Sequence, residues 1–483
     1  MTRTTVQPPT SSLKFGIARV DITPPVGIYH PLWGAARHHQ ATGIHRPLTA
    51  EIMVFEPLTD TEHKVPGFIR VQLDLPGLVK AQHELLRQAV SQASGWSTEQ
   101  IIISYSHTHA AGWFVPDRFE LPGGDLIAPY LDDLAQKLTT TTQQALKHTQ
   151  PVVMTYGFGH CSLAANRDYW DAERGVYACG FNPEIEADDT VTVVRVTDHD
   201  GALVAVIVNY ACHPTTLAWE NTLISPDYIG AMRETVEQAT GTLCVFTLGA
   251  CGDLGPREGF VGDTAVADRN GRQLGYAALS VLEAMDAPTT NYSYQGPVIS
   301  GATLGIWKLE ALSEDQLAQT RYFSGNCASL DLACKPKPDV GALTQELEEW
   351  QAEIAAADAY GDSVAARDAT ARAERARRWL ARLNDIPDSE ILPYEYTVYR
   401  IGDAIWITCG GEPYNVIVRD LRHRFPQVPI IFSPVSGDLQ VAYLLPKDRY
   451  GQGLYQEEPS ILAPGCLEIL TETIAEWIAE LNG

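Results

Sequence analysis

Basic residues are scarce in this chain relative to acidic ones. Its 483 residues include 35 Lys and Arg against 60 Asp and Glu, a formal net charge of −25 at pH 7. A surface with this charge is repelled by polyanions and by anionic bilayers. The charge balance therefore disfavours nucleic acid and membrane surfaces as partners.

Long apolar runs and recognisable export signals are also missing. The longest apolar runs, such as 203–208, are far below the roughly 20 residues that a membrane-spanning helix needs. Residues 1–13 are polar and lack the apolar segment of a secretory signal. The nine cysteines include no CxxC pair, which argues against a zinc knuckle or a dense disulfide framework. We expect a cytoplasmic protein without stable membrane insertion.

Apolar strand patterns alternate with helical patterns along most of the chain, which is typical of an α/β fold with a mixed β-sheet flanked by helices. We expect a disordered tail over 1–14 and a single domain over 15–483, because no linker or repeat divides the rest. The predicted strands lie at 100–104, 152–157, 191–197, 203–209 and 243–247, and the predicted helices at 78–93, 128–147, 227–239, 268–285 and 461–481.

Residues 342–384 differ from their surroundings. Two runs rich in Ala, Glu and Arg flank a Tyr-Gly-Asp turn at 360–362, which predicts a helical hairpin with an exposed, ion-paired face. The simplest interpretation is a structural insertion. A lid over a pocket and an arm that forms a homo-oligomer are the alternatives.

Two histidines, His107 and His109, directly follow the apolar run 101–103. If the strand continued, alternation would put both imidazoles on one face, about 6.6 Å apart. Neutral imidazole is the commonest ligand of transition metals in proteins. A pair of histidines in a polar turn is the alternative.

Further polar side chains follow other apolar strands. His213 comes after 206–208, Asp253 stands among glycines after 245–248, and Glu412 follows 404–409 with two glycines between. Ligands gathered from several strand ends can surround one metal ion and leave a position open for water. Taken singly, each residue also has a purely structural interpretation. His213 could be an ordinary loop histidine, Glu412 could be a carboxylate that stabilises a helix N-terminus, and Tyr443 could be an aromatic residue of the core.

These segments, in this order, resemble the N-terminal catalytic domain of the neutral/alkaline non-lysosomal ceramidases. The similarity runs along nearly the whole chain and ends near residue 450. The segments that carry it are GIARVDITP at 16–24, TGIH at 42–45, SHTH at 106–109, NR at 166–167, ACHP at 211–214, NTLISPD at 221–227, GD at 252–253 and GEP at 411–413.

The resemblance implies one Zn²⁺ per chain, held by His107, His213, Glu412 and Tyr443. It also implies catalytic roles for His109 and Arg167 beside the reacting carbonyl, for Asp253 in the loop that shapes the pocket, and for Tyr443. Zinc lowers the pKa of bound water to about 7 and polarises carbonyl groups. Imidazole and carboxylate ligands also suit iron, cobalt or manganese.

Two departures from the family pattern bear on the substrate. The family motif Gly-Asp-Val-Ser-Pro is Gly-Asp-Leu-Gly-Pro at 252–256, so Gly255 replaces a serine. Gly255 removes a possible serine nucleophile, which leaves metal-bound water as the expected attacker, and it opens space. Since the sequence ends at residue 483, we also expect it to lack the immunoglobulin-like C-terminal domain of those enzymes. An acidic protein without that domain is poorly suited to extract a lipid from a bilayer, so we expect a substrate smaller and more soluble than ceramide.

We therefore expect a zinc-dependent amidohydrolase that cleaves the carboxamide of an N-acyl compound. An esterase or lactonase on the same site is an alternative, since only the leaving group changes. A catalytically silent ligand-binding homologue is another, because a fold alone never proves activity. In a third alternative the main role of the protein is to form an oligomeric assembly through the hairpin at 342–384, and the strand-end site is vestigial.

Overall fold

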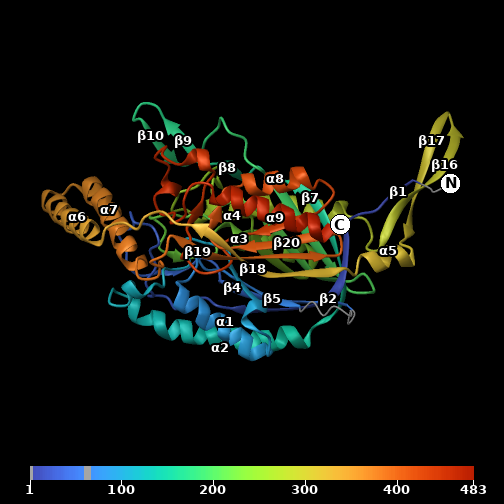
Figure 1. Ribbon diagram of the computed structural model, residues 1–483, viewed down its shortest axis with the longest axis horizontal. Helices are drawn as coiled ribbons and strands as arrows, with labels where there is room; N and C mark the ends of the chain where they lie inside the picture. Colours follow the sequence, from blue (N-terminus) through green and yellow to red (C-terminus); the bar gives the residue numbers. More distant parts are fainter. Residues whose placement is uncertain (1–3, 59–66, 483) are drawn as a thin grey trace.

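Two stacked β-sheets form the centre of the molecule in the computed structural model, which describes residues 4–58 and 67–482 (Figure 1). The larger sheet has eight strands in the order β14-β12-β11-β7-β2-β4-β5-β6. Its outermost pairs, β12 with β14 and β5 with β6, are parallel, and the pairs between are antiparallel. The strands are β2 (Thr10–Asp21), β4 (Thr49–Glu56), β5 (Phe68–Leu73), β6 (Ile101–Tyr105), β7 (Gln150–His160), β11 (Thr190–Thr197), β12 (Leu203–Tyr210) and β14 (Leu243–Leu248).

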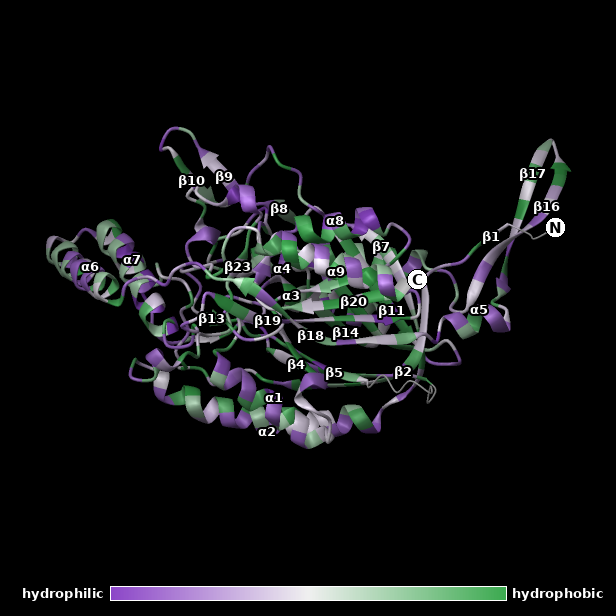
Figure 2. Cartoon of the chain, viewed as in Figure 1, coloured by the Kyte–Doolittle hydropathy of each residue, from purple (hydrophilic) through white to green (hydrophobic). Residues whose placement is uncertain are grey.

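The second sheet packs face to face on the first. It has four strands in the order β18-β19-β20-β22, namely β18 (Phe323–Ala333), β19 (Ile391–Ile401), β20 (Ala404–Cys409) and β22 (Ile430–Ser433). The Phe55 and Trp406 rings meet across the interface with centroids 5.4 Å apart, and those of Phe68 and Tyr399 with centroids 4.3 Å apart. Strands buried on both faces explain the nearly continuous apolar runs of the sequence, and Figure 2 shows strands such as β11, β14 and β20 as largely hydrophobic.

Helices cover the outer faces of both sheets. The helices α1 (Lys80–Ser94), α2 (Ile127–Lys147), α3 (Tyr228–Thr240) and α4 (Thr264–Ala284) pack on the larger sheet through one apolar cluster. The smaller sheet is covered by α8 (Val416–Arg424) and α9 (Cys466–Asn482). The predicted α/β class, with a mixed sheet flanked by helices, is confirmed. Within the described residues, no helix combines the length and apolar character needed to cross a bilayer.

Two elements project from opposite ends of this body (Figure 1). At one end α6 (Val340–Tyr360) and α7 (Ser363–Arg382) form an antiparallel pair in the interval where a hairpin is predicted. At the other end β16 (Thr290–Ser300) and β17 (Ala302–Ala311) form a ribbon, joined by β1 (Thr5–Val6). None of the predicted strands or helices falls within this ribbon. Most of its residues are exposed on both faces, so it lacks the apolar alternation that marks a strand.

Short elements complete the chain, and several of them surround the candidate site. They are β3 (Gly43–Ile44), β8 (Ala164–Asn166), β9 (Asp168–Asp171), β10 (Val176–Cys179), β13 (Leu223–Ile224), β15 (Leu254–Pro256), α5 (Glu314–Gln319), β21 (Glu412–Pro413) and β23 (Tyr443–Leu444).

The N-terminal segment differs from the predicted disordered tail over 1–14. Strand β2 begins at Thr10 and pairs with β7, and the Leu13 side chain is fully buried. Its partner strand lies about 140 residues away in the sequence, so local composition gave no sign of the pairing. Residues 1–3 lie outside the described residues. The single domain over 15–483 stays a prediction, which the apolar cluster shared by the two sheets supports.

Candidate metal centre

His107 lies just beyond the end of β6, in a left-handed conformation with φ of 65°. Its backbone N–H donates to the carbonyl of Leu75 at 3.0 Å, and its Nδ1 lies 2.5 Å from the carbonyl oxygen of Pro76. The strand ends at Tyr105, so the expectation that His107 and His109 share one strand face is wrong. The turn nevertheless brings the two rings together, with centroids 4.8 Å apart and planes at 89°.

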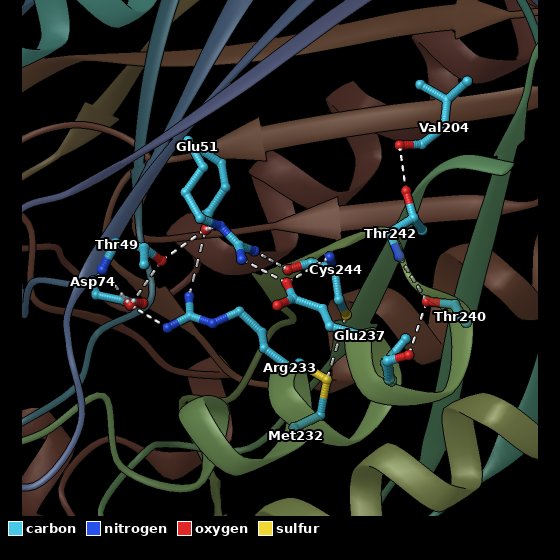
Figure 3. Close-up of polar contacts among 12 residues, drawn as sticks. Thr49, Glu51, Asp74, Val204, Met232, Arg233, Glu237, Thr240, Thr242 and Cys244 are labelled. Carbon is cyan, nitrogen blue, oxygen red and sulfur yellow. Dashed lines mark hydrogen bonds and ion pairs between the residues drawn. The ribbon is translucent and has the colours of Figure 1, made fainter.

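The loop that holds His107 is anchored by a buried ionic network (Figure 3). Asp74, at the end of β5, precedes Leu75 and accepts a hydrogen bond from the guanidinium of Arg233 on α3. The same carboxylate accepts the backbone N–H of Thr49 at 2.9 Å. Arg233 therefore fixes the chain immediately before the two carbonyls that bind His107.

His213 follows the end of β12 and is completely buried. Its Nδ1 lies 2.6 Å from the carbonyl oxygen of Cys251 and 3.0 Å from that of Leu254. Both carbonyls belong to the segment after β14, the parallel neighbour of β12. Parallel pairing brings the ends of these two strands to the same edge of the sheet, which explains why a loop some 40 residues away orients this imidazole.

Glu412 comes from the second sheet and joins the two histidines. Gly411, with φ of 67°, makes the turn after β20, and β21 then pairs with β23 so that Glu412 lies opposite Tyr443. The Oε2 atom of Glu412 lies 2.6 Å from Nε2 of His213, and its Oε1 lies 3.3 Å from Nε2 of His107. Ligand atoms of these three buried residues all lie within 4.8 Å of one another.

The donor chemistry of this cluster fits a metal cation. Each imidazole directs Nδ1 at a backbone carbonyl, so Nδ1 carries the hydrogen and Nε2 of a neutral ring presents a lone pair. Both lone pairs face carboxylate oxygens, which are acceptors too, so a proton or a metal ion must lie between them. Burial, followed by the Arg167 charge, lowers the pKa of His213 to about 4, which disfavours the proton there. At His107 burial lowers the pKa, but Glu412 and the carbonyl of Pro76 together raise it by more.

Tyr443 and Arg167 lie beside this cluster. The Nη2 of Arg167 donates to the Tyr443 hydroxyl at 3.1 Å and to the carbonyl of Gly252 at 2.8 Å. Burial raises the pKa of Tyr443 well above its usual value, so the phenol keeps its proton. Burial lowers the pKa of Arg167, but Tyr443 and other groups raise it by more, so the guanidinium stays charged.

The Nε2 atom of His109 is buried and has no hydrogen-bond partner among the described residues. Its ring lies between the His107 ring and the Trp33 ring, with centroid distances of 4.8 and 5.2 Å. Burial, then the two neighbouring histidines, lowers the pKa of His109 well below its usual value. The imidazole is therefore neutral and can accept a proton.

Asp253 is near the cluster, but its carboxylate is directed at the protein. Its Oδ1 accepts the backbone N–H of Asn415 at 2.7 Å, and its Oδ2 accepts a bond from the Asn166 side chain at 3.4 Å. Its backbone carbonyl accepts the N–H of Arg167 at 2.9 Å. Asp253 thus holds the loop that carries Gly252 against the segments of Arg167 and Glu412.

Several neighbours of the site had no recognisable signal in the sequence. Trp33 lies in a loop rich in Pro, Gly and His. Tyr455 begins a three-residue 3-10 helix, and its ring lies 5.9 Å from that of Tyr443. Arg378 and Arg382 of α7 belong to the helix predicted to present an exposed ion-paired face. At Gly255 an added Cβ would lie 3.7 Å from Cδ of Arg167, an ordinary van der Waals distance, so a small side chain would fit beside that arginine.

The fold and this cluster define the chain as an α/β protein with a candidate metal site built from both of its sheets. The family model of the neutral/alkaline non-lysosomal ceramidases, N-terminal part, matches residues 13–256, which are 244 of the 483 residues. The chain belongs to this family, and the predicted resemblance is confirmed.

Individual relatives are distant in sequence. A neutral ceramidase of Pseudomonas aeruginosa is 22% identical over 252 residues, which cover 50% of this chain and only 37% of that protein. The crystal structure of the neutral ceramidase from Pseudomonas aeruginosa superposes with a TM-score of 0.62 at 16% identity and covers 97% of this chain and 74% of that one. A structure of a ceramidase complexed with C2 gives a TM-score of 0.61 over the same shares of both chains. At these identities, the structural similarity concerns the fold.

Proposed function

We propose that this protein is a zinc-dependent hydrolase that cleaves the carboxamide bond of an N-acyl compound. One Zn²⁺ per chain would be held by His107, His213 and Glu412, with Tyr443 as a fourth ligand. Bound zinc would supply Lewis acidity and activate water for attack on the carbonyl group. Family membership supports the hydrolase class.

One observation carries the proposal. The Nε2 atoms of His107 and His213 both face the Glu412 carboxylate, while carbonyls of the chain hold both Nδ1 atoms. Histidines that bind zinc usually donate their other ring N–H to a carbonyl in this way. At His213, whose pKa burial lowers to about 4, a structural cluster would instead place a donor opposite Nε2.

The remaining residues would act on the substrate. Arg167 stays charged beside the Tyr443 hydroxyl, so the two groups can offset negative charge that develops on the carbonyl oxygen. His109, whose Nε2 is unpaired and whose ring is neutral, can take a proton from the attacking water and give it to the leaving amine. Asp253 would position the Gly252 carbonyl that orients Arg167.

The substrate that we propose is smaller and more soluble than ceramide. The net charge of −25 supports this view, because it opposes approach to an anionic lipid surface. An ester or lactone in place of the amide uses the same groups and is the second candidate. A silent ligand-binding homologue is the third, and the replacement of the family serine by Gly255 is the feature that favours it.

Metal analysis combined with a substrate panel tests the proposal. We expect about one zinc per wild-type chain and little in His213→Ala, measured by mass spectrometry of the metal content. Hydrolysis of N-acyl amides, matched esters and lactones should disappear in the same variant. His160→Ala is the matched control, because the His160 side chain is exposed and pairs with Asp189 at the surface. No metal in either protein after reconstitution would refute the metal site, and faster turnover of esters would favour the second candidate.

A further inference from the structure

Helix α7 crosses from one border of the candidate site to the other. On one side, Arg378 donates to the carbonyl of Leu32. The next residue is Trp33, and the Trp33 ring packs against the ring of His109. On the other side, Arg382 donates to the carbonyl of Gln440 at 3.2 Å and to that of Pro459 at 3.0 Å. The projecting hairpin is thereby tied to the walls of the site.

Both segments held by Arg382 flank Tyr443. Gln440 precedes Tyr443 by three residues, and the hydroxyl of Ser460, next to Pro459, donates to the Tyr443 carbonyl at 2.7 Å. Through the two carbonyls that it binds, the Arg382 guanidinium holds together the two segments that border Tyr443.

Arg382 differs from the other arginines along this border, which have carboxylate partners. Arg118, Arg377 and Arg378 all bond to Glu374, and Arg118 also pairs with Asp117 at 3.3 Å. Arg382 makes no ion pair with a carboxylate in the described part of the chain, and its buried Nε has no hydrogen-bond partner there.

The carboxylate with the largest effect on Arg382 is already engaged. Glu458 raises the pKa of Arg382 against the larger lowering by burial. Its Oε1 lies 2.5 Å from Nη1 of Arg375 and 2.5 Å from Nε1 of Trp379. In a chain of net charge −25, a partly buried arginine such as Arg382, which has no carboxylate partner among the described residues, indicates that an anion completes the arrangement.

We propose that the substrate carries an anionic group, a carboxylate in the simplest case, and that Arg382, assisted by Arg378, binds it at the border of the site. This inference rests on the proposed function, since it assigns the substrate class of the same site. The scissile amide would lie at the cluster of His107, His213 and Glu412. The substrate class is then an N-acyl amino acid or a similar acylated acid.

The test compares two ligands that differ only in charge, N-octanoylglycine and its neutral amide, N-octanoylglycinamide. Affinities are measured by isothermal titration calorimetry, and the products of each titration are identified by mass spectrometry. Wild type should prefer the carboxylate by about 10- to 100-fold, the range expected for a charge-assisted hydrogen bond. In Arg382→Gln the two affinities should agree within about threefold, and Arg382→Lys should retain part of the preference.

Arg367→Gln is the control, because it removes a charge from the exposed face of the same helix, where Arg367 pairs with Asp368. It should keep the wild-type ratio. Equal affinities in wild type would overturn the inference. So would an Arg382→Gln variant in which both affinities fall by the same factor, since that result means that Arg382 only fastens loops. If Arg382→Gln does not fold, as judged from its melting curve, the wild-type and Arg382→Lys ratios decide.

The outcomes separate this inference from the proposed function. Preference for the carboxylate without hydrolysis of either ligand would keep the anion subsite and refute the hydrolase. Hydrolysis of both ligands without preference would keep the hydrolase and refute the anion subsite.

Discussion

Replacing Arg233 with Met should destabilise the protein strongly, although no part of that side chain touches the metal ligands. Arg233 is 5% exposed, and its guanidinium bonds to Asp74 and lies 3.8 Å from Glu51 (Figure 3). Glu51 would keep Arg19, whose Nε is 2.7 Å away. Asp74, 1% exposed, would lose its only cationic partner among the described residues.

The magnitude follows from the buried charge that is left on Asp74. Removing one partner of a buried ion pair costs about 3–5 kcal/mol. Because Asp74 still accepts the Thr49 N–H at 2.9 Å, we expect a loss near the lower end, about 3 kcal/mol. Urea denaturation followed by circular dichroism measures it, with an unchanged slope of free energy against urea concentration as the sign of two-state unfolding.

The control is Arg269→Met, which breaks a surface pair with Glu258 in which the two side chains are 56% and 55% exposed. That pair should contribute at most about 1 kcal/mol. A loss below about 1 kcal/mol for Arg233→Met would refute the reasoning, since it would mean that water or movement of the chain solvates Asp74. Zinc affinity should also fall in Arg233→Met relative to the control, because Asp74 fixes the carbonyls that orient His107.

Three further outcomes are expected. Glu412→Gln should lower zinc affinity by more than the roughly 10- to 100-fold typical of outer-shell changes, and an unchanged affinity in a chelator competition would exclude Glu412 as a ligand. Burial raises the pKa of Asp227 to about 6 against about 3.9 when unfolded, so its charge penalises the folded state above pH 6 and the penalty disappears by about pH 4. As the pH falls from 7 to 4, the free energy of unfolding of wild type should therefore rise relative to that of Asp227→Asn by up to about 2.8 kcal/mol, at about 1.36 kcal/mol per pKa unit. Urea denaturation at both pH values measures this difference, and a difference that does not change with pH would contradict the raised pKa. Gly255→Ser should change stability by less than about 0.5 kcal/mol, because its Cβ would meet only ordinary contacts at 3.7 and 3.8 Å, and a large drop in melting temperature would contradict this.

Local pattern predicted the regular body of the fold well. The predicted helix at 128–147 corresponds to α2 at 127–147, and the predicted strand at 191–197 to β11 at 190–197. One face of each of these elements packs on the core, so the spacing of apolar residues in the sequence indicates the element. The ribbon of β16 and β17 is largely exposed, so its sequence has no such spacing of apolar residues. The start of strand β2 at Thr10 falls within the predicted disordered tail, because that part of the strand is defined by pairing with the distant β7.

The sequence by itself determined which residue types follow which strands: histidines after β6 and β12, a carboxylate after β20, and glycines at the turns between. Only the tertiary structure decided that these side chains meet, since Glu412 joins His107 and His213 across two sheets. It also decided the state of each imidazole, through the carbonyls of Pro76 and Cys251, and it brought Arg382 of a projecting helix to the border of the site. Spacing along a chain defines local conformation, whereas the approach of distant segments depends on how buried faces pack together.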